Sequence, residues 1–371
     1  MRRSNLQLAA RGIASLPTVA RNDIARKDEL VMKEAILYEK LEDNRVRCNL
    51  CAHRCLIKEG KRGICLVREN RDGALYTLVY GRTISQAVDP VEKKPLFNFY
   101  PGTTAFSVAT VGCNFRCDFC QNWQISQAVR DEHLIMGQEA TPEQLVATAK
   151  RYGCRSIAYT YTEPTIFTEY AYDTARLAHE AGIANIYVTN GYMTAGAGEM
   201  LEAFDPYLDA ANVDLKAWSD EFYRQYCGAR LQPVLDSLKK MKELGVWVEV
   251  TTLVIPTLND SDGELQQIAE FIAQELGAET PWHISRFHPQ YKLADKPRTP
   301  ITTLDRAHEI GLAAGLRYVY QGNVPGSEGE NTLCYNCGKL LIGRHGYRIM
   351  ENHIKDAKCT YCKVRIDGVG L

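Results

Sequence analysis

Short apolar segments alternate with longer amphipathic segments along most of the chain. From residue 105 onward, runs rich in β-branched and aromatic residues are separated by segments in which apolar residues recur every three or four positions. The apolar runs predict strands at Ala105–Val111, Ser156–Tyr161, Ile186–Asn190, Ala211–Lys216, Trp247–Val254, His283–Phe287 and Arg317–Tyr320. The amphipathic segments predict helices at Glu143–Tyr152, Ile166–Ala181, Glu199–Tyr207, Pro233–Leu244, Gly263–Leu276 and Leu304–Ala314. Regular alternation indicates a parallel sheet, so we expect an α/β fold with a partial (β/α)6–7 TIM-like barrel.

Both ends of the chain depart from this alternation. Residues 1–30 are polar and basic without a clear period, which predicts a flexible basic arm. Residues 31–105 are predicted to form an N-terminal cysteine-rich cap, and residues 106–325 the barrel. Residues 326–371 carry four cysteines and no barrel unit, so we expect a C-terminal four-cysteine knuckle there.

Composition and charge narrow the class of protein. The chain has 371 residues, of which 45% are hydrophobic and 24% charged, as in ordinary globular proteins. A net charge of −1 provides no basic field, so we do not expect nucleic acid or an anionic membrane as the main partner. The 13 cysteines lie mostly at the short spacings of metal sites rather than of disulfides, which predicts a reducing compartment. No apolar segment follows Arg2-Arg3, so we expect a soluble cytoplasmic protein without an export signal.

Three cysteines directly after the first predicted barrel strand give the strongest functional indication. Cys113, Cys117 and Cys120 are spaced C-x3-C-x2-C. A [4Fe–4S] cluster that only transfers electrons usually has four cysteine ligands, so three leave one iron open to a chelating ligand. The amine and carboxylate of S-adenosylmethionine (SAM) can fill that position, and an electron delivered to its sulfonium yields a 5′-deoxyadenosyl radical that abstracts hydrogen. The alternative is a zinc knuckle, but zinc sites usually come as paired hooks and this triplet has no fourth cysteine nearby.

Polar residues at the ends of later predicted strands belong to the same candidate site. Glu163 stands between Thr162 and Pro164, in a rigid turn that can direct a carboxylate inward. Asp214 and Lys216 are two residues apart on one strand, so their side chains share a face. A charged pair that faces a barrel interior has to be partnered or functional. The alternative is that these are ordinary polar strand ends, where loops begin.

Two further groups of cysteines predict metal sites. Cys48, Cys51, Cys55 and Cys65 are spaced C-x2-C-x3-C-x9-C, which suits either zinc or an auxiliary iron–sulfur cluster, with zinc the conservative interpretation. In the tail, two C-x2-C hooks are typical of a zinc ribbon or a rubredoxin-like knuckle, and we expect a structural zinc on Cys334, Cys337, Cys359 and Cys362. Basic residues around these hooks leave nucleic-acid binding as an alternative for the tail.

The sequence closely resembles the radical SAM superfamily, and within it the branch of the pyruvate formate-lyase activating enzyme. It is most similar to the radical SAM member of the AmmeMemoRadiSam system. The stretches that carry the resemblance are Lys33-Glu34-Ala35, Tyr38–Leu41, Cys48–Cys65 with Arg68-Glu69-Asn70, Asp89–Leu96 (DPVEKKPL), Gly112–Ser126 (GCNFRCDFCQNWQIS), Tyr161–Pro164 (YTEP), Val188–Gly191 (VTNG), Asp214–Lys216 and Gly322–Gly326 (GNVPG). They extend over nearly everything after residue 30, and the cysteine motif is the most specific of them.

The resemblance implies a role for each candidate residue. It makes the three cysteines of the triplet the catalytic cluster ligands, places Phe119 against the adenine of SAM, and puts the segment of Glu163 at the methionine amino group. Four further positions match residues that line the SAM or substrate cavity in relatives: Asn190, Asp214, Lys216 and His288. The chain departs from the family where relatives carry a glycine-rich GGE in place of Tyr161-Thr162-Glu163, and where Val188 replaces an aspartate of some activases.

The resemblance also implies an oxidoreductase that receives one electron from ferredoxin or flavodoxin. Two kinds of substrate are compatible with it. One is a glycine in a partner protein, as for a glycyl-radical-enzyme activase. The other is a small molecule handled together with Memo-like and AMMECR-like partner proteins. The alternative of a different class is a non-catalytic iron–sulfur or zinc-binding protein, which would not require a long barrel.

Overall fold

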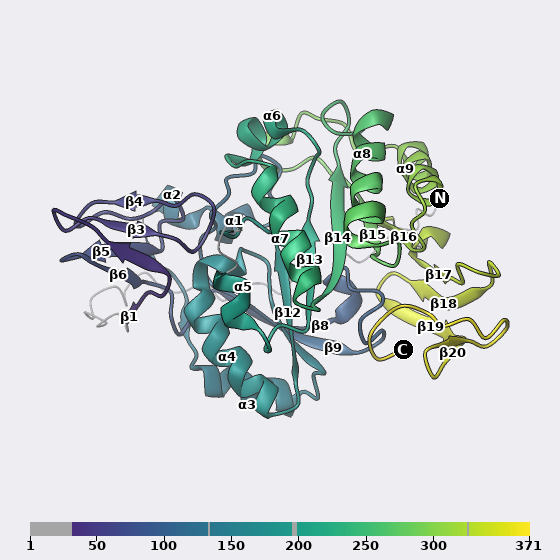
Figure 1. Cartoon of the computed structure of the whole chain (residues 1–371), viewed down its shortest axis with the longest axis horizontal. Helices are drawn as coiled ribbons and strands as arrows, with labels where there is room; N and C mark the ends of the chain where they lie inside the picture. Colours follow the sequence, from purple (N-terminus) through teal and green to yellow (C-terminus); the bar gives the residue numbers. More distant parts are fainter. Residues whose placement is uncertain (1–31, 133, 195–198, 325) are drawn as a thin grey trace, which may run out of the picture. The chain divides into compact units, whose positions relative to one another are not determined.

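The computed structural model describes residues 32–132, 134–194, 199–324 and 326–371 (Figure 1). The arm predicted for residues 1–30 lies outside the described residues, and so does Pro325 of the GNVPG stretch. None of the described helices is long and apolar enough to cross a membrane.

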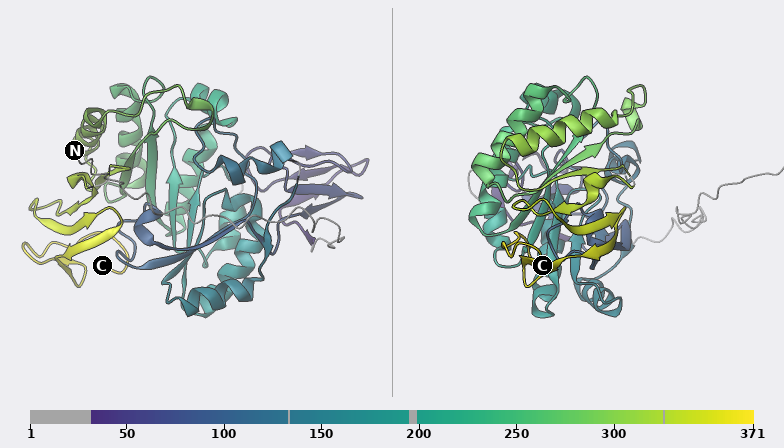
Figure 2. Two further views of the ribbon diagram at one scale, coloured as in Figure 1. Left: turned by 180° about the vertical axis from the view of Figure 1, so that it is seen from behind. Right: turned by 90° about the vertical axis from the view of Figure 1, so that its right-hand side faces the viewer.

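A single eight-stranded sheet forms the centre of the fold. Its strand order is β16-β15-β14-β13-β12-β11-β9-β8. The strands are β8 (Ser85–Pro90), β9 (Thr104–Ala109), β11 (Ser156–Tyr159), β12 (Ala184–Thr189), β13 (Ala210–Asp214), β14 (Trp247–Val254), β15 (Trp282–Arg286) and β16 (Val319–Gly322). Neighbours from β9 to β16 are parallel, whereas β8 pairs antiparallel with β9, Ser85 opposite Ala109 and Pro90 opposite Thr104 (Figure 2). The predicted α/β class with a partial barrel is confirmed.

Helices connect the parallel strands and cover one face of the sheet (Figure 1). They are α3 (Pro142–Arg151), α4 (Thr168–Glu180), α5 (Glu199–Phe204), α7 (Gln232–Glu243), α8 (Asp262–Phe271) and α9 (Ile301–Ala313). Helix α3 begins at a capping box, in which the Thr141 side chain accepts from Gln144 N and the Gln144 side chain accepts from Thr141 N. Apolar residues of strands and helices, including Ile157, Leu238 and Ile268, form one continuous buried core.

Shorter elements surround the central sheet. In the cap, β2 (Tyr38–Lys40), β3 (Val46–Cys48) and β4 (Leu56–Ile57) form one antiparallel sheet, and β1 (Lys33–Glu34), β6 (Ala74–Thr77) and β5 (Arg68–Arg71) form another. The connections contain β7 (Arg82–Thr83), α1 (Trp123–Ser126), α2 (Ala128–Glu132), β10 (Gln138–Glu139) and α6 (Asp220–Phe222). The range predicted for the cap, 31–105, therefore includes β8, which the structure adds to the edge of the central sheet.

A buried ion pair joins the cap to the barrel. Arg68 of β5 donates from Nη1 to Oε2 of Glu169 at 2.9 Å and from Nη2 to Oε1 at 2.8 Å. Glu169 lies in the first turn of α4, and its Oε1 also accepts the backbone N–H of Ile36 at 2.8 Å. The Arg68 and Glu169 side chains are 2% and 0% exposed. This bidentate contact fixes the cysteine-bearing cap beside the start of α4.

The tail forms a small antiparallel sheet that packs beside the last barrel strand. Its strands are β17 (Thr332–Leu333), β18 (Leu340–His345) and β19 (Arg348–Asn352), followed by the pair β20 (Ile354–Lys355) and β21 (Lys358–Cys359) (Figure 1). Buried residues of the tail, including Leu341 and Ile366, share a hydrophobic cluster with Phe97, Tyr318 and Tyr320. The tail is therefore continuous with the packing of the barrel.

Candidate functional site

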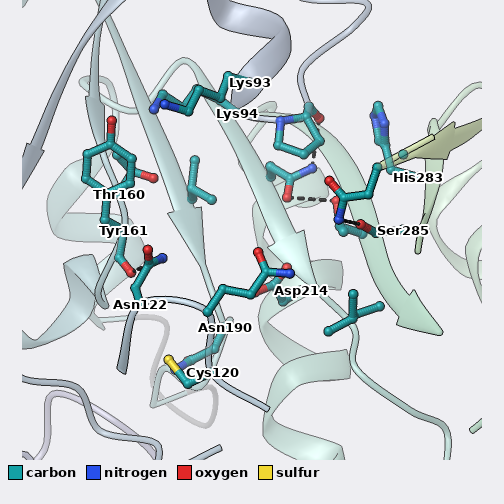
Figure 3. A pocket seen from close by; sticks show the side chains of 18 of the residues that line it. Lys93, Lys94, Cys120, Asn122, Thr160, Tyr161, Asn190, Asp214, His283 and Ser285 are labelled. Atoms are coloured by element: carbon teal, nitrogen blue, oxygen red, sulfur yellow. Dashed lines mark hydrogen bonds between the residues drawn. The ribbon is translucent and has the colours of Figure 1, made fainter. Parts of the chain in front are cut away.

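One cavity of about 860 Å³ collects the residues singled out from the barrel sequence (Figure 3). It is bounded by the ends of the parallel strands and by the loop that follows β9. The predicted residues among its lining are Cys113, Cys117, Cys120, Phe119, Glu163, Asn190, Asp214, Lys216 and His288. Side chains from four strand ends and one loop thus meet in a single space, at the end of the barrel strands where such folds carry their chemistry.

The loop after β9 presents three thiols to the cavity. Cys117 is buried and Cys113 and Cys120 are partly buried. Burial raises the pKa of Cys113 and of Cys120, so their thiolates require a positive partner such as a metal. Gly112 has φ 98°, and a Cβ there would meet Val67 Cγ1 at 2.8 Å, so glycine permits the turn that delivers Cys113.

Among the described residues, these three are the cysteines that line the cavity. Cys227 is completely buried beside Cys117, and a hydrogen bond between the two thiols lowers the pKa of Cys117 while burial raises that of Cys227. Cys154 is 5% exposed and packs in the main core. The donor set that faces the cavity therefore suits a cluster with one iron left open.

Hydrogen bonds of the Glu163 carboxylate link the segment after β11 to the end of β12. Its Oε1 accepts from Thr165 N at 3.0 Å, Thr165 Oγ1 at 2.6 Å and Thr189 Oγ1 at 2.7 Å, and its Oε2 accepts from Asn190 N at 2.8 Å. The residue is 1% exposed, and burial raises the pKa of its carboxyl despite these donors. The carboxylate is thus occupied by the protein and orders Asn190, whose Nδ2 donates to Asn114 Oδ1 at 2.8 Å.

Tyr161 adopts the backbone conformation of a glycine. Its φ is 65°, in the left-handed region that tyrosine rarely adopts. Its carbonyl accepts from Asn122 Nδ2 at 2.9 Å, and its hydroxyl donates to Asp89. The chain therefore keeps a glycine-like path at the start of the segment where the resembling family has GGE, and side-chain contacts hold the tyrosine in it.

Asp214 and Lys216 form an ion pair at the end of β13, with Lys216 Nζ 2.9 Å from Asp214 Oδ2. Burial by itself would lower the pKa of Lys216, but the Asp214 carboxylate and the nearby thiols of Cys117 and Cys227 hold it well above its usual value. Lys216 Nζ also lies 5.7 Å from the ring centroid of Phe119. The ammonium is therefore a fixed positive charge beside the cysteine loop.

The N-terminal cysteines lie outside this cavity but close to it. The backbone of Cys51 forms a bridge with Met193, and His53 Nε2 is 2.9 Å from Asn114 O. A Cβ on Gly112 would lie 3.3 Å from Cys65 O. Within the described ranges, no three of Cys48, Cys51, Cys55 and Cys65 have their sulfurs all within 4.8 Å of one another. In the same described ranges, Cys113, Cys117 and Cys120 do not form such a group either, so this criterion does not separate a zinc site from a cluster site here.

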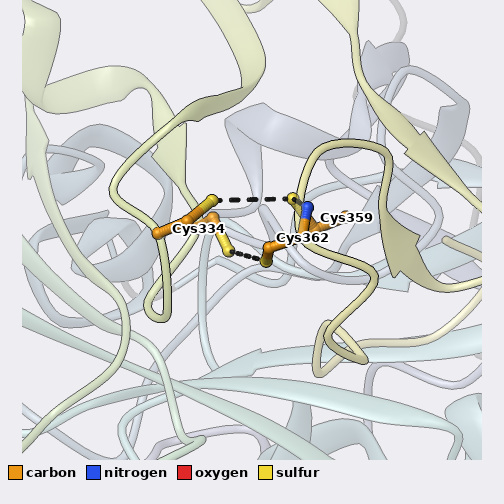
Figure 4. Close-up of side chains that lie close together, drawn as sticks. Cys334, Cys359 and Cys362 are labelled. Carbon is orange, nitrogen blue, oxygen red and sulfur yellow. Dashed lines mark hydrogen bonds between the residues drawn. The ribbon is translucent and has the colours of Figure 1, made fainter.

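The four tail cysteines are gathered as a compact site (Figure 4). Their sulfurs all lie within 4.8 Å of one another, with Cys334 Sγ 3.6 Å from Cys362 Sγ and Cys337 Sγ 3.8 Å from Cys359 Sγ. These edges match the tetrahedron of about 3.8 Å expected for four thiolates around one zinc. The two predicted hooks therefore meet with the spacing of a closed metal site.

Opposite the cysteine loop lies a charged group, Asp89 with Lys93 and Lys94, to which the sequence alone gives no role. Asp89 accepts hydrogen bonds from Lys93 Nζ at 2.9 Å, Lys94 Nζ at 2.7 Å and Ser107 Oγ at 2.7 Å, and from the Tyr161 hydroxyl. Both lysines line the cavity. The DPVEKKPL stretch was the available signal, because it was among the segments that carry the family resemblance.

Comparisons with known proteins agree with this fold and motif. A sequence model of the Radical SAM superfamily matches residues 107–272. An uncharacterized protein of Methanocaldococcus jannaschii is 52% identical over 338 residues, covering 91% of this chain and 99% of the relative. The pyruvate formate-lyase-activating enzyme of Clostridium pasteurianum is 27% identical over 203 residues, covering 50% of this chain and 80% of that enzyme. The crystal structure of a radical SAM methyltransferase from Sphaerobacter thermophilus gives a TM-score of 0.47 at 20% identity, covering 65% of this chain and 71% of the other. The chain belongs to the radical SAM superfamily.

We expect Glu163→Gln to weaken SAM binding by about tenfold without changing the iron content, because an amide cannot accept all the hydrogen bonds that the carboxylate receives. Isothermal titration with SAM measures the effect. Glu264→Gln is the control, since Glu264 also accepts backbone N–H groups, those of Trp218 and Ser219, but neither it nor these partners line the cavity. Equal SAM affinities in the wild type and Glu163→Gln would contradict this role.

Proposed function

We propose that the chain cleaves SAM reductively at a [4Fe–4S] cluster held by Cys113, Cys117 and Cys120. The observation that carries the proposal is the set of three thiols that faces one cavity, without a fourth among the residues that the structure describes. When bound, the cluster supplies the electron that cleaves SAM and gives a radical able to abstract hydrogen from a substrate. Membership of the superfamily and likeness to an activating enzyme support this chemistry.

The other cavity residues would position SAM and exclude water. Phe119 offers an apolar surface beside the cysteine loop, packed against Phe222 with ring centroids 5.7 Å apart. Glu163 and Asn190 would order the strand ends that receive the amino-acid part of SAM. Asp214, Lys216 and His288 would orient SAM or substrate from the ends of β13 and β15. Each role follows the family pattern at a matching position.

Production of 5′-deoxyadenosine tests this proposal. The anaerobically reconstituted full-length protein, given SAM and dithionite, should form 5′-deoxyadenosine, which liquid chromatography with mass spectrometry detects. A fully iron-loaded preparation that leaves SAM intact would overturn the proposal.

For the N-terminal cysteines we propose an auxiliary iron–sulfur cluster. The spacing of the four cysteines also suits zinc, which is the conservative interpretation of the sequence. Their position beside Gly112 and Asn114 would set such a cluster near the first one. Iron in excess of four atoms per chain supports this proposal, and one additional zinc in its place would contradict it.

For the tail we predict a structural zinc. The full-length protein should contain one zinc per chain, and Cys337→Ser should lose it, since three thiolates hold zinc less tightly than four. Inductively coupled plasma mass spectrometry measures the metal. The control is Cys154→Ala, which removes a thiol that packs in the core and should leave the zinc in place. Iron in place of zinc in the tail would show a rubredoxin-like site instead.

Two substrate classes remain within the proposed function. A glycyl-radical-enzyme activase role is supported by likeness to the Clostridium enzyme and to the benzylsuccinate synthase activating enzyme of Thauera aromatica, 23% identical over 184 residues. A small-molecule substrate, with Memo-like and AMMECR-like proteins as partners, is the second candidate. It is favoured by Lys93 and Lys94, two cationic side chains that line the cavity. In either case the electron would come from a ferredoxin or flavodoxin. A cytoplasmic location stays a prediction based on the cysteine spacings.

A further inference from the structure

The cavity continues from the three cysteines to a second polar region. Figure 3 shows Lys93 and Lys94 at the opposite end of the cavity from Cys120. Both lysines belong to the connection that leaves β8 and crosses to β9, at the open edge of the sheet. Tyr347, from the turn between β18 and β19, lines the same cavity. The cap-to-barrel connection and the tail thus build a wall that faces the cysteine loop.

Two ammonium groups at this wall share one carboxylate. Lys93 Nζ is 2.9 Å from Asp89 Oδ1, and Lys94 Nζ is 2.7 Å from Asp89 Oδ2. Tyr161 and Ser107 use further acceptor positions of the same carboxylate. Each ammonium has three N–H donors, so donors on both lysines are left for another acceptor. One carboxylate balances one ammonium, and the pair of lysines therefore carries one positive charge in surplus.

One of the two lysines is sheltered from solvent. The Lys94 side chain is 1% exposed and the Lys93 side chain 42% exposed. Burial lowers the pKa of Lys94 to about 8, against the opposing effect of Asp89, so the side chain is mostly protonated at pH 7. Keeping a cation away from water costs free energy unless an anion compensates it, and Asp89 compensates the buried Lys94. The surplus charge therefore lies on Lys93, which is partly exposed and lines the cavity.

The other carboxyl groups of the wall have their own contacts. Glu92 accepts from Gly102 N at 2.7 Å, and Glu330 accepts from Gly346 N at 2.9 Å. Among the ion pairs of the described residues, neither carboxyl group contacts Lys93 or Lys94. The second oxygen of Glu92 is buried without a hydrogen-bond partner. Among the described residues, the wall therefore presents N–H donors on Lys93 and Lys94 and an unpaired acceptor oxygen on Glu92.

We propose that this wall binds the substrate of the proposed reaction, a small molecule that carries a carboxylate or phosphate group, through Lys93 and Lys94. The inference rests on the proposed function, because that function makes the opposite end of the cavity the place where SAM is cleaved. One continuous cavity of about 860 Å³ extends from the cysteine loop to this wall, so a molecule held by the wall would share the space in which SAM is cleaved.

SAM itself does not account for the two lysines. Its carboxylate and amine are the groups that chelate the open iron in the proposed function, and these belong beside Cys113, Cys117 and Cys120. The acidic group held at the far wall must therefore come from a second molecule.

Binding of simple anions to the full-length protein tests the inference. The probes are inorganic phosphate and malonate, titrated calorimetrically at pH 7 without a reductant. We expect at least one of the two anions to bind the wild-type protein. Lys93→Met should bind that anion at least about tenfold more weakly, because the variant loses a charge-assisted hydrogen bond. Lys93→Arg keeps the positive charge and should retain the binding. Lys239→Met is the matched control: Lys239 is also 42% exposed and pairs with one carboxylate, Glu275, but does not line the cavity.

The outcomes separate this inference from the proposed function. Preference for phosphate or for malonate identifies the acidic group of the substrate. If neither anion binds, or if Lys93→Met and Lys239→Met bind equally well, the inference is overturned even when SAM cleavage is intact. Anion binding that depends on Lys93 in a protein unable to cleave SAM would overturn the proposed function and leave the anion site standing.

Discussion

Replacing Cys113, Cys117 or Cys120 by alanine should reduce 5′-deoxyadenosine formation at least about a thousandfold, equivalent to about 4 kcal/mol of activation free energy. Each substitution removes one of the three thiols that face the cavity, and the described residues provide no other cysteine in its lining. With two thiolates, the cluster would be lost or would no longer hold SAM at its open iron. Chromatographic quantification after anaerobic reconstitution measures the loss.

Cys227→Ala is the control for this series. Cys227 is buried next to Cys117 and does not line the cavity, so its removal should leave most of the activity. Iron that remains after all three ligand cysteines are replaced would belong to the N-terminal group. Undiminished SAM cleavage in any single ligand variant would show that the cluster is held elsewhere.

Arg68→Met should lower the free energy of unfolding by about 3–5 kcal/mol, because it leaves the buried carboxylate of Glu169 without its charged partner. The substitution keeps most of the side-chain volume and removes the two hydrogen bonds of the guanidinium to Glu169 and its third to Ile36 O. Urea unfolding, followed by circular dichroism, measures the change. Combining Arg68→Met with Glu169→Gln should recover part of the loss, since the neutral amide costs less to bury and can still accept from Ile36 N.

Arg62→Met gives the matched comparison within the same cap. Arg62 contacts Glu69 at 2.8 Å, but its side chain is 32% exposed, so we expect a loss below about 1 kcal/mol. Similar losses for Arg62→Met and Arg68→Met would mean that the bidentate contact with α4 does not anchor the cap.

The barrel could be predicted from the sequence because its strands and helices repeat one pattern. Trp247–Val254 was placed with its observed bounds, and the first strand was extended by two residues because Thr110-Val111 continue the apolar run into the loop. The range predicted for the cap includes the edge strand β8, since Ser85–Pro90 has no continuous apolar run and ends in proline. Its place in the sheet comes from antiparallel pairing with β9, which no local pattern shows.

The candidate site, like the fold, was predictable where its residues lie close together in sequence and not where they meet only through strand pairing. Spacing alone singled out Cys113, Cys117 and Cys120, because close ligands in sequence stay close in space. Asp89, Lys93 and Lys94 were not assigned to the cavity, because they reach it only through the pairing of β8 at the open edge of the sheet. The position of the N-terminal cysteine group beside the cysteine loop could not be predicted from its spacing either, since the cap strands that position it are only two to four residues long.

Electron paramagnetic resonance of the dithionite-reduced, reconstituted protein tests the central claim most directly. Three thiolates and one open iron predict that SAM binds the cluster itself, so adding SAM should shift the spectrum of the reduced [4Fe–4S] cluster, and the Cys117→Ala variant should lose the SAM-dependent part. A reduced cluster whose spectrum is the same with and without SAM would contradict the account.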